Sequence, residues 1–245
     1  MNYVFLDTTD STMSYCSAHQ SDLRDMTMVV AHNQHSGRGQ RGNGWESEPG
    51  KNLTVTLFHI PEDRDAADPL PVRQFRVSMA AALAVADTLA RYGIPAQVKW
   101  SNDVYIGDRK ASGILIEHTV AGSGIVNSRI GIGLNVNQSV FLSDAPNPVS
   151  MSQTTGEEYV LAEVLDALSE CLEARLRQSR NQLYADYIKA LWRHDGLPHT
   201  FRLREADRRE FQAVIKDVRP DGPLILATSD GQLHNFYFKE IEFVL

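Results

Sequence analysis

The chain has 245 residues, of which 42% are hydrophobic and 22% are charged, and its formal net charge is -7. This composition is typical of a folded globular protein and argues against a disordered chain. The acidic balance argues against a surface built mainly to hold nucleic acid or an anionic membrane, because both need clustered Lys and Arg.

The cysteine and targeting signals point to a reducing compartment. Cys16 and Cys171 form no Cys-x-x-Cys pair, so neither a disulfide framework nor a zinc cluster is indicated. The N-terminus enters a strand-like run at once, without the basic and apolar segments of a signal peptide. No window reaches the roughly 18 apolar residues that a membrane-spanning helix needs. We therefore expect a cytoplasmic protein that works without a membrane.

Strand-like and helical segments alternate along the first part of the chain. A long Ala-rich helix is predicted over 72–92, where Gly93 and Pro95 end the periodic pattern. A second long helical segment is predicted over 157–195. The alternation predicts a mixed sheet in an α/β or α+β fold. Strands are predicted over 4–6, 26–31, 53–59, 98–100, 104–106, 112–117 and 130–136, and a short helix is predicted over 12–19.

After Gly196 the pattern changes to short alternating runs. Turn sequences at Arg219-Pro-Asp-Gly222 and Ser229-Asp-Gly231 separate them. We expect two units, a catalytic one over 1–195 and a small β-barrel over 196–245. The strands predicted in the second unit are 200–203, 210–216, 224–227 and 233–238.

A glycine-rich loop, Gly37-Arg-Gly-Gln-Arg-Gly42, follows the strand predicted over 26–31. Its glycines let backbone N–H groups approach an anion, and Arg38 and Arg41 can donate paired hydrogen bonds to carboxylate or phosphate. The letters match the dinucleotide motif G-x-G-x-x-G, but that motif must open a helix, and here a strand follows. The loop therefore indicates an anion site, with a solvated surface hairpin as the alternative.

A second polar cluster, Lys99-Trp-Ser-Asn-Asp103, precedes a turn that enters an apolar strand at Lys110. This placement can aim the Lys110 ammonium into a cleft, although a lone turn lysine is usually solvated. Asn102 and Asp103 belong to the same predicted hairpin, and Gly131-Ile-Gly133-Leu-Asn135 offers open backbone in a further strand. Because these polar residues and open glycines are predicted to lie near Lys110, a functional lysine is favoured. The spacing of the residues alone does not identify the reaction.

Together these blocks resemble the catalytic domain of the biotin–protein ligase family. The family's glycine loop is similar to 37–42 followed by Trp45, its central signature to 99–103, and its catalytic-lysine segment to Arg109-Lys-Ala-Ser-Gly-Ile-Leu115. The resemblance covers most of 4–137 and implies an α+β, class II aminoacyl-tRNA-synthetase-like catalytic domain with a C-terminal SH3-like β-barrel. Because only about ten residues precede the ligase-like block, it also implies a short form without an N-terminal DNA-binding domain.

The resemblance implies a two-step reaction with biotin and ATP as substrates and Mg²⁺ as the metal. The biotin carboxylate attacks the α-phosphate of ATP to give biotinyl-5′-AMP, and an acceptor lysine then displaces AMP. The implied acceptor is a biotin carboxyl carrier domain of a carboxylase or decarboxylase. DNA binding is not expected, and a homodimer made by pairing sheet edges stays open.

The resemblance also assigns roles residue by residue. Ser11, Thr12 and Gln34 would bond the ureido ring, although a Ser or Thr after Asp10 is more often a helix cap. Arg38, Lys110 and Asp103 would be catalytic. The two cations would hold the carboxylate and the α-phosphate, and Asp103 would lie near the metal or the attacking amine. Further biotin contacts are implied for Gly37, Gly113, Ile114, Gly131 and Gly133, and nucleotide contacts for Arg41, Trp45, Asn102, Lys110 and Asn135.

Two positions depart from the family pattern. Met13 stands where the family often has Asn after Ser-Thr, and Ser101 replaces the Pro of Trp-Pro-Asn-Asp. The nearest alternative function is a lipoate or octanoate ligase or transferase of the same fold. A hydrocarbon tail offers little to buried hydrogen-bonding groups, so Ser11, Thr12 and Gln34 favour biotin.

Overall fold

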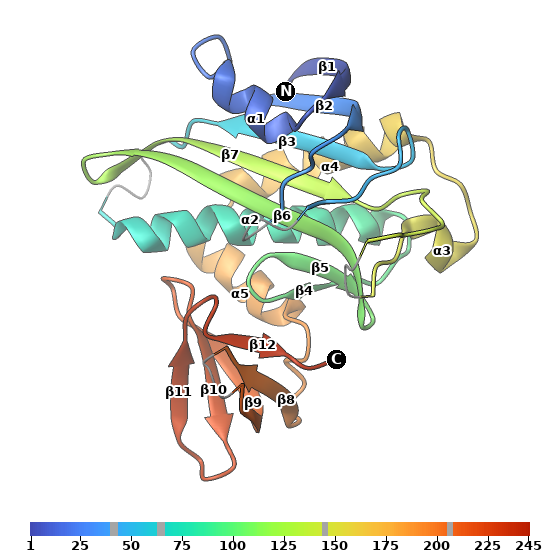
Figure 1. The fold of residues 1–245 in the computed structure, drawn as a ribbon. Coiled ribbons are helices and arrows are strands. Elements are labelled where there is room, and N and C mark those ends of the chain that lie inside the picture. The colour runs from blue at the N-terminus through green and yellow to red at the C-terminus, as the bar shows by residue number, and fades with distance from the viewer. Residues whose placement is uncertain (40–43, 63–66, 144–146, 205–207) are drawn as a thin grey trace.

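A seven-stranded mixed sheet and a five-stranded antiparallel sheet organise the chain (Figure 1). The computed structural model describes residues 1–39, 44–62, 67–143, 147–204 and 208–245. The larger sheet contains β1 (Asn2–Thr9), β2 (Thr27–Gln34), β3 (Leu53–His59), β4 (Gln97–Lys99), β5 (Asp103–Ile106), β6 (Arg109–Ala121) and β7 (Gly124–Leu134). The smaller sheet contains β8 (His199–Leu203), β9 (Glu210–Val218), β10 (Leu224–Thr228), β11 (Leu233–Phe236) and β12 (Ile241–Phe243). The helices are α1 (Thr12–Ala18), α2 (Leu70–Arg91), α3 (Met151–Thr155), α4 (Leu161–Arg177) and α5 (Arg180–Ala190).

The larger sheet has the order β1-β2-β3-β7-β6-β5-β4, in which β1 and β2 pair in parallel and the other neighbours are antiparallel. All of the inner strand β3 is buried, so both of its faces are covered. Leu53, Val55 and Leu57 join the apolar core with α2. Because side chains alternate along a strand, Thr54 and Thr56 face the opposite side, where α1 lies. One face of the sheet therefore carries the core, and the other carries polar groups.

The Ala-rich helix α2 packs against β6 and β7 and against α4 and α5. Its alanines are almost all buried, and their small side chains allow close approach on several sides at once. It begins after Pro69 and ends at Arg91, so the helix predicted over 72–92 is confirmed to within two residues at each end. None of the helices in the described ranges combines the length and the apolar character that crossing a bilayer requires.

The single helix predicted over 157–195 is wrong, because the segment forms α4 and α5 with a break between them. Gln178 and Ser179 have extended backbone angles at the break. Ser179 then caps α5, since its hydroxyl accepts a hydrogen bond from the backbone N–H of Gln182. The short elements α3 and β12 are also absent from the sequence-based prediction.

The five-stranded sheet docks on the larger unit through α5 and the turn after β4 (Figure 1). The Trp100 indole donates a 2.8 Å hydrogen bond to the Gly222 carbonyl, and its ring meets Phe238 edge-on. From α5, the Tyr184 hydroxyl donates to the Val218 carbonyl at 2.8 Å. The predicted α+β class, with a mixed sheet and a small C-terminal β unit, is confirmed. We propose that the division between the two units lies between α5 and β8.

A partly buried histidine lies in the long hairpin of β6 and β7. His118 Nδ1 is 2.8 Å from the Ser128 hydroxyl, and the neighbouring Arg129 guanidinium contacts Glu117. Burial lowers the pKa of His118 from 6.5 to about 4, and the positive charge of Arg129 acts in the same direction. The folded chain therefore holds this imidazole neutral in mild acid.

We predict that His118 makes the protein less stable as the pH falls from about 6.5 towards 4. The unfolded chain binds a proton at the higher pKa, so the contribution of His118 is present above about pH 6.5 and is lost below it. Urea unfolding across this range should give a smaller pH dependence for His118→Gln than for the wild type. The exposed His19→Gln variant is the control, and equal slopes in His118→Gln and the wild type would contradict the assignment.

Candidate active site

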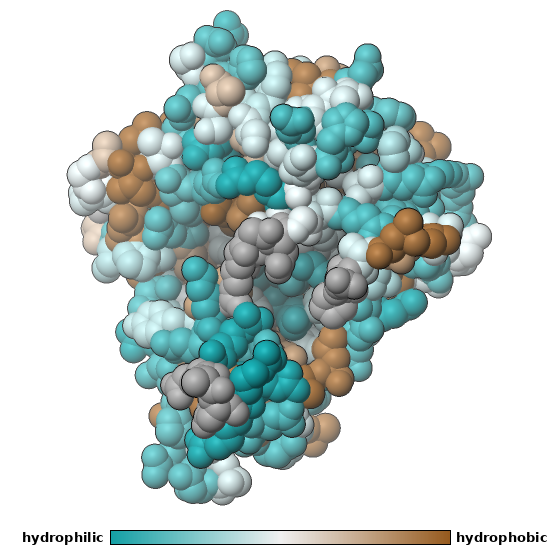
Figure 2. Space-filling view, viewed as in Figure 1, coloured by the Kyte–Doolittle hydropathy of each residue, from teal (hydrophilic) through white to brown (hydrophobic). Residues whose placement is uncertain are grey.

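A cavity of about 800 Å³ lies on the polar face of the larger sheet, against the C-terminal unit. Figure 2 shows the surface hollowed between the two units on this side of the molecule. Asn102 is not part of the cavity lining, and Arg41 lies outside the described residues. The other sequence-predicted residues all line the cavity, namely Ser11, Thr12, Gln34, Gly37, Arg38, Trp45, Asp103, Lys110, Gly113, Ile114, Gly131, Gly133 and Asn135.

Ser11 occupies the N-cap position of α1 but does not cap it. Its backbone is extended and its side chain makes no capping hydrogen bond, although the residue is only 2% exposed. The cap role that usually explains a serine at this position is therefore absent. A buried hydroxyl that lines a cavity without serving the helix is available to a ligand.

Thr12 and Gln34 are joined by a short polar chain that starts in β3. The Thr56 hydroxyl donates to Thr12 Oγ1 at 2.8 Å, and Thr12 Oγ1 donates to Gln34 Oε1 at 3.3 Å. The backbone N–H of Thr12 donates to the same Gln34 oxygen at 2.9 Å. Thr56 has no role in the sequence-based prediction. The alternation of Thr and apolar residues over 53–57 is the signal that could have singled it out.

At four glycines of the site, an added Cβ would collide with a neighbouring residue. A Cβ at Gly133 would lie 2.2 Å from Cε2 of Trp45, and one at Gly113 would lie 2.8 Å from Cζ3 of the same ring. At Gly131 it would meet Met13 at 2.9 Å, and at Gly37 it would lie 2.7 Å from Gln34 Nε2. The cavity floor is therefore bare backbone on which flat groups can lie.

Trp45 rests on that floor. Its backbone N–H donates to the Gly37 carbonyl at 2.8 Å, and Arg38 and Gly44 form a bridge, so the ends of the glycine loop are tied together. The indole Nε1 is buried and has no hydrogen-bond partner among the described residues. A buried N–H without a hydrogen-bond partner lowers the stability of the folded state. Movement of the Trp45 ring, or a ligand that accepts a hydrogen bond from it, would remove that cost.

Lys110 lines the cavity from the start of β6. The tight turn before it contains Gly107, whose positive φ of 58° suits glycine. Lys110 Nζ lies 2.9 Å from the Asp103 carboxylate and 6.0 Å from the centroid of the Trp45 ring. The hairpin therefore turns the ammonium towards the cavity and a carboxylate rather than into bulk solvent. Its catalytic role stays a prediction.

Arg38 lines the same cavity but is paired with a residue that carries no role in the sequence-based prediction. Its guanidinium donates to Glu117 at 2.9 Å, and Glu117 also contacts Arg129 at 3.4 Å. The Arg38 side chain is 48% exposed, and such half-exposed ion pairs contribute roughly 0–1 kcal/mol. An incoming anion can therefore compete with Glu117 for Arg38.

The two predicted asparagines differ in position. Asn102 is 6% exposed and donates to the Ile114 carbonyl at 2.8 Å, which ties the turn to β6. Asn135 lines the cavity and donates to the Val149 carbonyl at 3.1 Å. Its Oδ1 is buried without a hydrogen-bond partner in the described part of the chain. Asn135, rather than Asn102, is therefore placed to accept a hydrogen bond from a ligand.

Lys99 is a second lysine of the cavity to which the sequence analysis gives no role. Its ammonium donates to the Tyr105 hydroxyl at 3.0 Å and lies 5.4 Å from the centroid of the Phe243 ring. Burial lowers the pKa of Lys99, while the Asp103 carboxylate opposes that shift. The aromatic contacts hold this cation near Lys110 without cancelling its charge.

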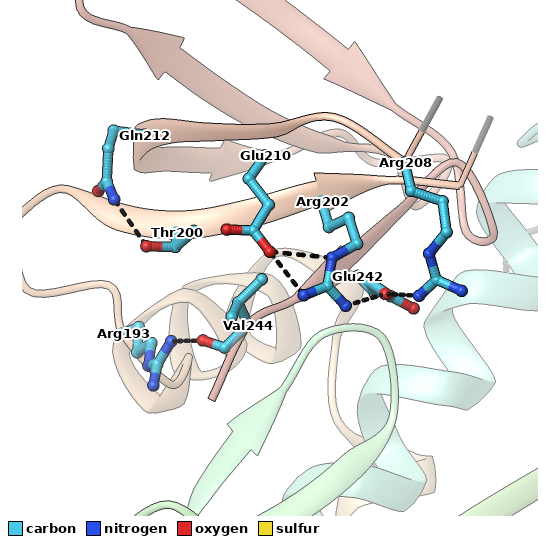
Figure 3. Close-up of polar contacts among 8 residues, drawn as sticks. All are labelled: Arg193, Thr200, Arg202, Arg208, Glu210, Gln212, Glu242 and Val244. Atoms are coloured by element: carbon cyan, nitrogen blue, oxygen red, sulfur yellow. Dashed lines mark hydrogen bonds and ion pairs between the residues drawn. The ribbon is translucent and has the colours of Figure 1, made fainter. Parts of the chain in front are cut away.

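The C-terminal unit contributes one wall of the cavity, including Arg204, Glu242 and Phe243. Glu242 lies among arginines, with Arg202 at 2.9 Å, Arg204 at 3.0 Å and Arg208 at 2.8 Å. Figure 3 shows Arg202, from β8, and Arg208, from just before β9, converging on this carboxylate. Burial alone would raise the pKa of Glu242, but the Arg202 hydrogen bond and the nearby arginine charges hold it below its usual value.

Comparisons with known proteins agree on one family. The model of the biotin/lipoate A/B protein ligase family matches residues 5–137. The chain is 33% identical over 236 residues to a biotin–[acetyl-CoA-carboxylase] ligase of Paracoccus denitrificans, covering 91% of this chain and 93% of that protein. It is 29% identical over 251 residues to the bifunctional ligase/repressor BirA of Bacillus spizizenii, covering 98% and 73% respectively. The fold matches a biotin protein ligase from Aquifex aeolicus, solved with biotin and ATP, with a TM-score of 0.78 at 22% identity and coverage of 98% and 97%.

We predict that Gly133→Ala displaces Trp45 from the cavity floor. The added Cβ would lie 2.2 Å from the indole, so the ring must move, and overpacking of this kind costs about 1–3 kcal/mol of unfolding free energy. Trp45 emission should shift to longer wavelength as the ring becomes exposed. Comparison with the same change in a Trp45→Phe background assigns the shift to this tryptophan.

Gly124→Ala is the matched control, because it lies on the same strand and its Cβ would meet only Ala121 O at 3.7 Å. It should change the unfolding free energy by less than about 0.5 kcal/mol. An unchanged spectrum in Gly133→Ala would show that the ring does not lie on Gly133.

Proposed function

We propose that this chain, which belongs to the biotin/lipoate A/B protein ligase family, is a biotin–protein ligase. In the proposed reaction it activates biotin with ATP to biotinyl-5′-AMP and then transfers biotin to a lysine of an acceptor protein. The Paracoccus relative is named as a biotin–[acetyl-CoA-carboxylase] ligase, and the Aquifex biotin protein ligase of the same fold was solved with biotin and ATP. The site supplies the chemistry for both steps.

The observation that carries the proposal is the polar group at the start of α1 in a cavity that also holds Lys110. Ser11, Thr12 and Gln34 offer both donors and acceptors, which matches a ureido ring with two N–H groups and one carbonyl. A lipoyl or octanoyl chain would leave these groups unpaired, at a cost of roughly 1–3 kcal/mol each. The lipoate or octanoate alternative is therefore not favoured.

In the first step, a biotin carboxylate oxygen attacks the α-phosphorus of ATP, and the bond to the pyrophosphate oxygen breaks. Two anions must meet, so fixed cations are needed to offset their repulsion. Lys110 is proposed to hold the carboxylate and the α-phosphate, and Arg38 would join it after leaving Glu117. Lys99 adds a third positive charge to the same cavity.

In the second step, the amine of the acceptor lysine attacks the acyl carbon of biotinyl-5′-AMP, and AMP leaves. The amine must lose a proton as the amide forms. Asp103 is the carboxylate beside Lys110, and we assign it the positioning of Lys110 and of the approaching amine. The proposed acceptor is a biotin carboxyl carrier domain of a carboxylase or decarboxylase.

Magnesium is proposed to arrive with ATP rather than to reside in the protein. Within the described ranges no three His, Cys, Asp or Glu side chains come together as a metal site. Nucleotide-bound Mg²⁺ is usually held by one or two carboxylates together with phosphate oxygens, and Asp103 can supply one of them. Bound there, Mg²⁺ would offset phosphate charge.

The C-terminal unit is proposed to complete the nucleotide end of the cavity. Arg204 and Phe243 line the same space as Lys110, and Arg204 lowers the pKa of Lys99, although burial is the larger cause. A guanidinium at this wall can meet the outer phosphates of ATP. The absence of DNA binding, the homodimer and the cytoplasmic location stay predictions.

We predict that the purified protein catalyses ATP–pyrophosphate exchange that depends on biotin and Mg²⁺. Biotin, lipoate, octanoate and no acid should be compared at equal concentration. Exchange with biotin should exceed that with the other acids by at least about 100-fold, because buried polar groups reject ligands that leave them unpaired. Exchange with lipoate alone would replace the proposed substrate, and no exchange with any acid would refute the adenylating step.

We also predict that Lys110→Ala folds but lowers biotin-dependent exchange by about 10²–10³-fold, the scale for losing one preorganised charge-stabilising donor. Lys51→Ala is the control, because the Lys51 side chain is 41% exposed, pairs with Glu158 across the surface and is not part of the cavity lining. Both variants should unfold within a few degrees of the wild type. Near-normal exchange in Lys110→Ala would remove this residue from the mechanism.

A further inference from the structure

We propose that Thr56, which does not line the cavity, fixes which groups of Thr12 and Gln34 donate and accept hydrogen bonds when they bind the ureido ring. It is a positioning residue that acts through Thr12 and Gln34. The inference rests on the proposed function and deepens it, because it names what sets the specificity of the same site.

Thr56 is fully buried in the inner strand β3 and faces α1. It is absent from the cavity lining, whereas its neighbour Thr54 is part of it. The Thr56 hydroxyl donates to Thr12 Oγ1 at 2.8 Å, and its carbonyl accepts from the Cys16 thiol at 3.9 Å. Thr56 therefore cannot touch a ligand, and any influence it has must pass through Thr12.

The hydrogen bond from Thr56 fixes the direction of the next one. Thr12 Oγ1 receives the Thr56 proton and donates its own proton to Gln34 Oε1. Hydrogen bonds in such a chain polarise one another in the same sense. The remaining lone pair of Thr12 Oγ1 is left as an acceptor, which suits a ureido N–H.

The same chain orients the Gln34 amide. Its oxygen is held by the backbone N–H and the hydroxyl of Thr12, so its Nε2 must point the other way. That nitrogen lies next to Gly37, where a Cβ would come within 2.7 Å of it. An amide N–H on this side is a donor, which suits the ureido carbonyl.

The resulting pattern is an acceptor at Thr12 and a donor at Gln34. It matches biotin and opposes 2-iminobiotin, in which an imino donor replaces the carbonyl acceptor. Without the hydrogen bond from Thr56, the Thr12 hydroxyl can rotate. The hydrogen bond from the Thr12 hydroxyl to Gln34 Oε1 is then no longer enforced, and the Gln34 amide is held less firmly in one orientation. Specificity for the ring carbonyl should then weaken, with little change in the chemistry at Lys110.

The test compares binding of biotin, 2-iminobiotin and desthiobiotin to wild type, Thr56→Val and Thr56→Ser by calorimetry and competition. Thr56→Val keeps the shape but removes the hydroxyl, and Thr56→Ser keeps the hydroxyl. In Thr56→Val, biotin and desthiobiotin should bind about fivefold to tenfold more weakly, the scale of one neutral hydrogen bond. Affinity for 2-iminobiotin should not fall, so the preference for biotin drops by the same factor. Thr56→Ser should restore it.

The kinetics of ATP–pyrophosphate exchange distinguish a positioning role of Thr56 from a catalytic role and from a general loss of folded protein. In Thr56→Val the KM for biotin should rise while kcat and the KM for ATP stay within about twofold. Thr88→Val is the matched control, because its hydroxyl is equally buried but bonds Ala84 O inside α2. Equal weakening of biotin and 2-iminobiotin, or a preference unchanged from wild type, would overturn the proposal.

If Thr56→Val does not fold, the separate variants Thr56→Ser and Gln34→Glu still test the proposal. Gln34→Glu replaces the donor by an acceptor and should reverse the preference between biotin and 2-iminobiotin. An unreversed preference would also count against the proposal. Failure of the wild type to use biotin would refute the proposed function itself, whereas a wild type that uses biotin with an indifferent Thr56 would refute only this inference.

Discussion

The register of β3, β7 and β6 is the constraint on which the whole site depends. Thr56 pairs with Gly131, and two residues further along the sheet Gly133 pairs with Gly113. Because side chains alternate, these rows face the cavity together. A slip of one residue would put Ile132 on the floor and send the glycines into the core. The same pairing therefore creates the open backbone for a flat ligand and places a buried hydroxyl beside it, on the same face of the sheet.

Ion pairs hold several cations of the cavity, whereas aromatic contacts hold Lys99. Lys110 is held by Asp103, Arg38 by Glu117, and Arg204 by Glu242. The Asp103 carboxylate lowers the cost of partly burying the Lys110 ammonium, while the Arg38 and Arg204 side chains stay 48% and 42% exposed. An anionic ligand gains its contacts only by exchanging partners, so part of its binding energy goes into releasing these pairs.

The sequence predicts those helices and strands whose type and ends are set by residues within or next to them. The helix over 72–92 and the strand over 53–59 are confirmed because their periodicity is long and their ends carry turn residues. The break at Ser179 falls within the polar run 177–182, and the prediction misses it because the seven-residue spacing of Leu176 and Leu183 also fits one continuous helix. In the site, residues inside the motifs could be placed by resemblance. Thr56 and Phe243 lie outside those motifs. The alternation over 53–57 can put Thr56 on the polar face, but its contact with Thr12 and the place of Phe243 depend on strand pairing and domain packing.

The strand β12 brings the last described residue to the cavity. Leu245 lines it together with Phe243, whereas Met1 precedes the edge strand β1 on the far side of the larger sheet (Figure 1). Any segment joined after Leu245, such as a purification tag or a fused reporter, would start at the cavity wall. One joined before Met1 would start away from it. The attachment point consequently decides whether an added segment competes for the space that the ligands need.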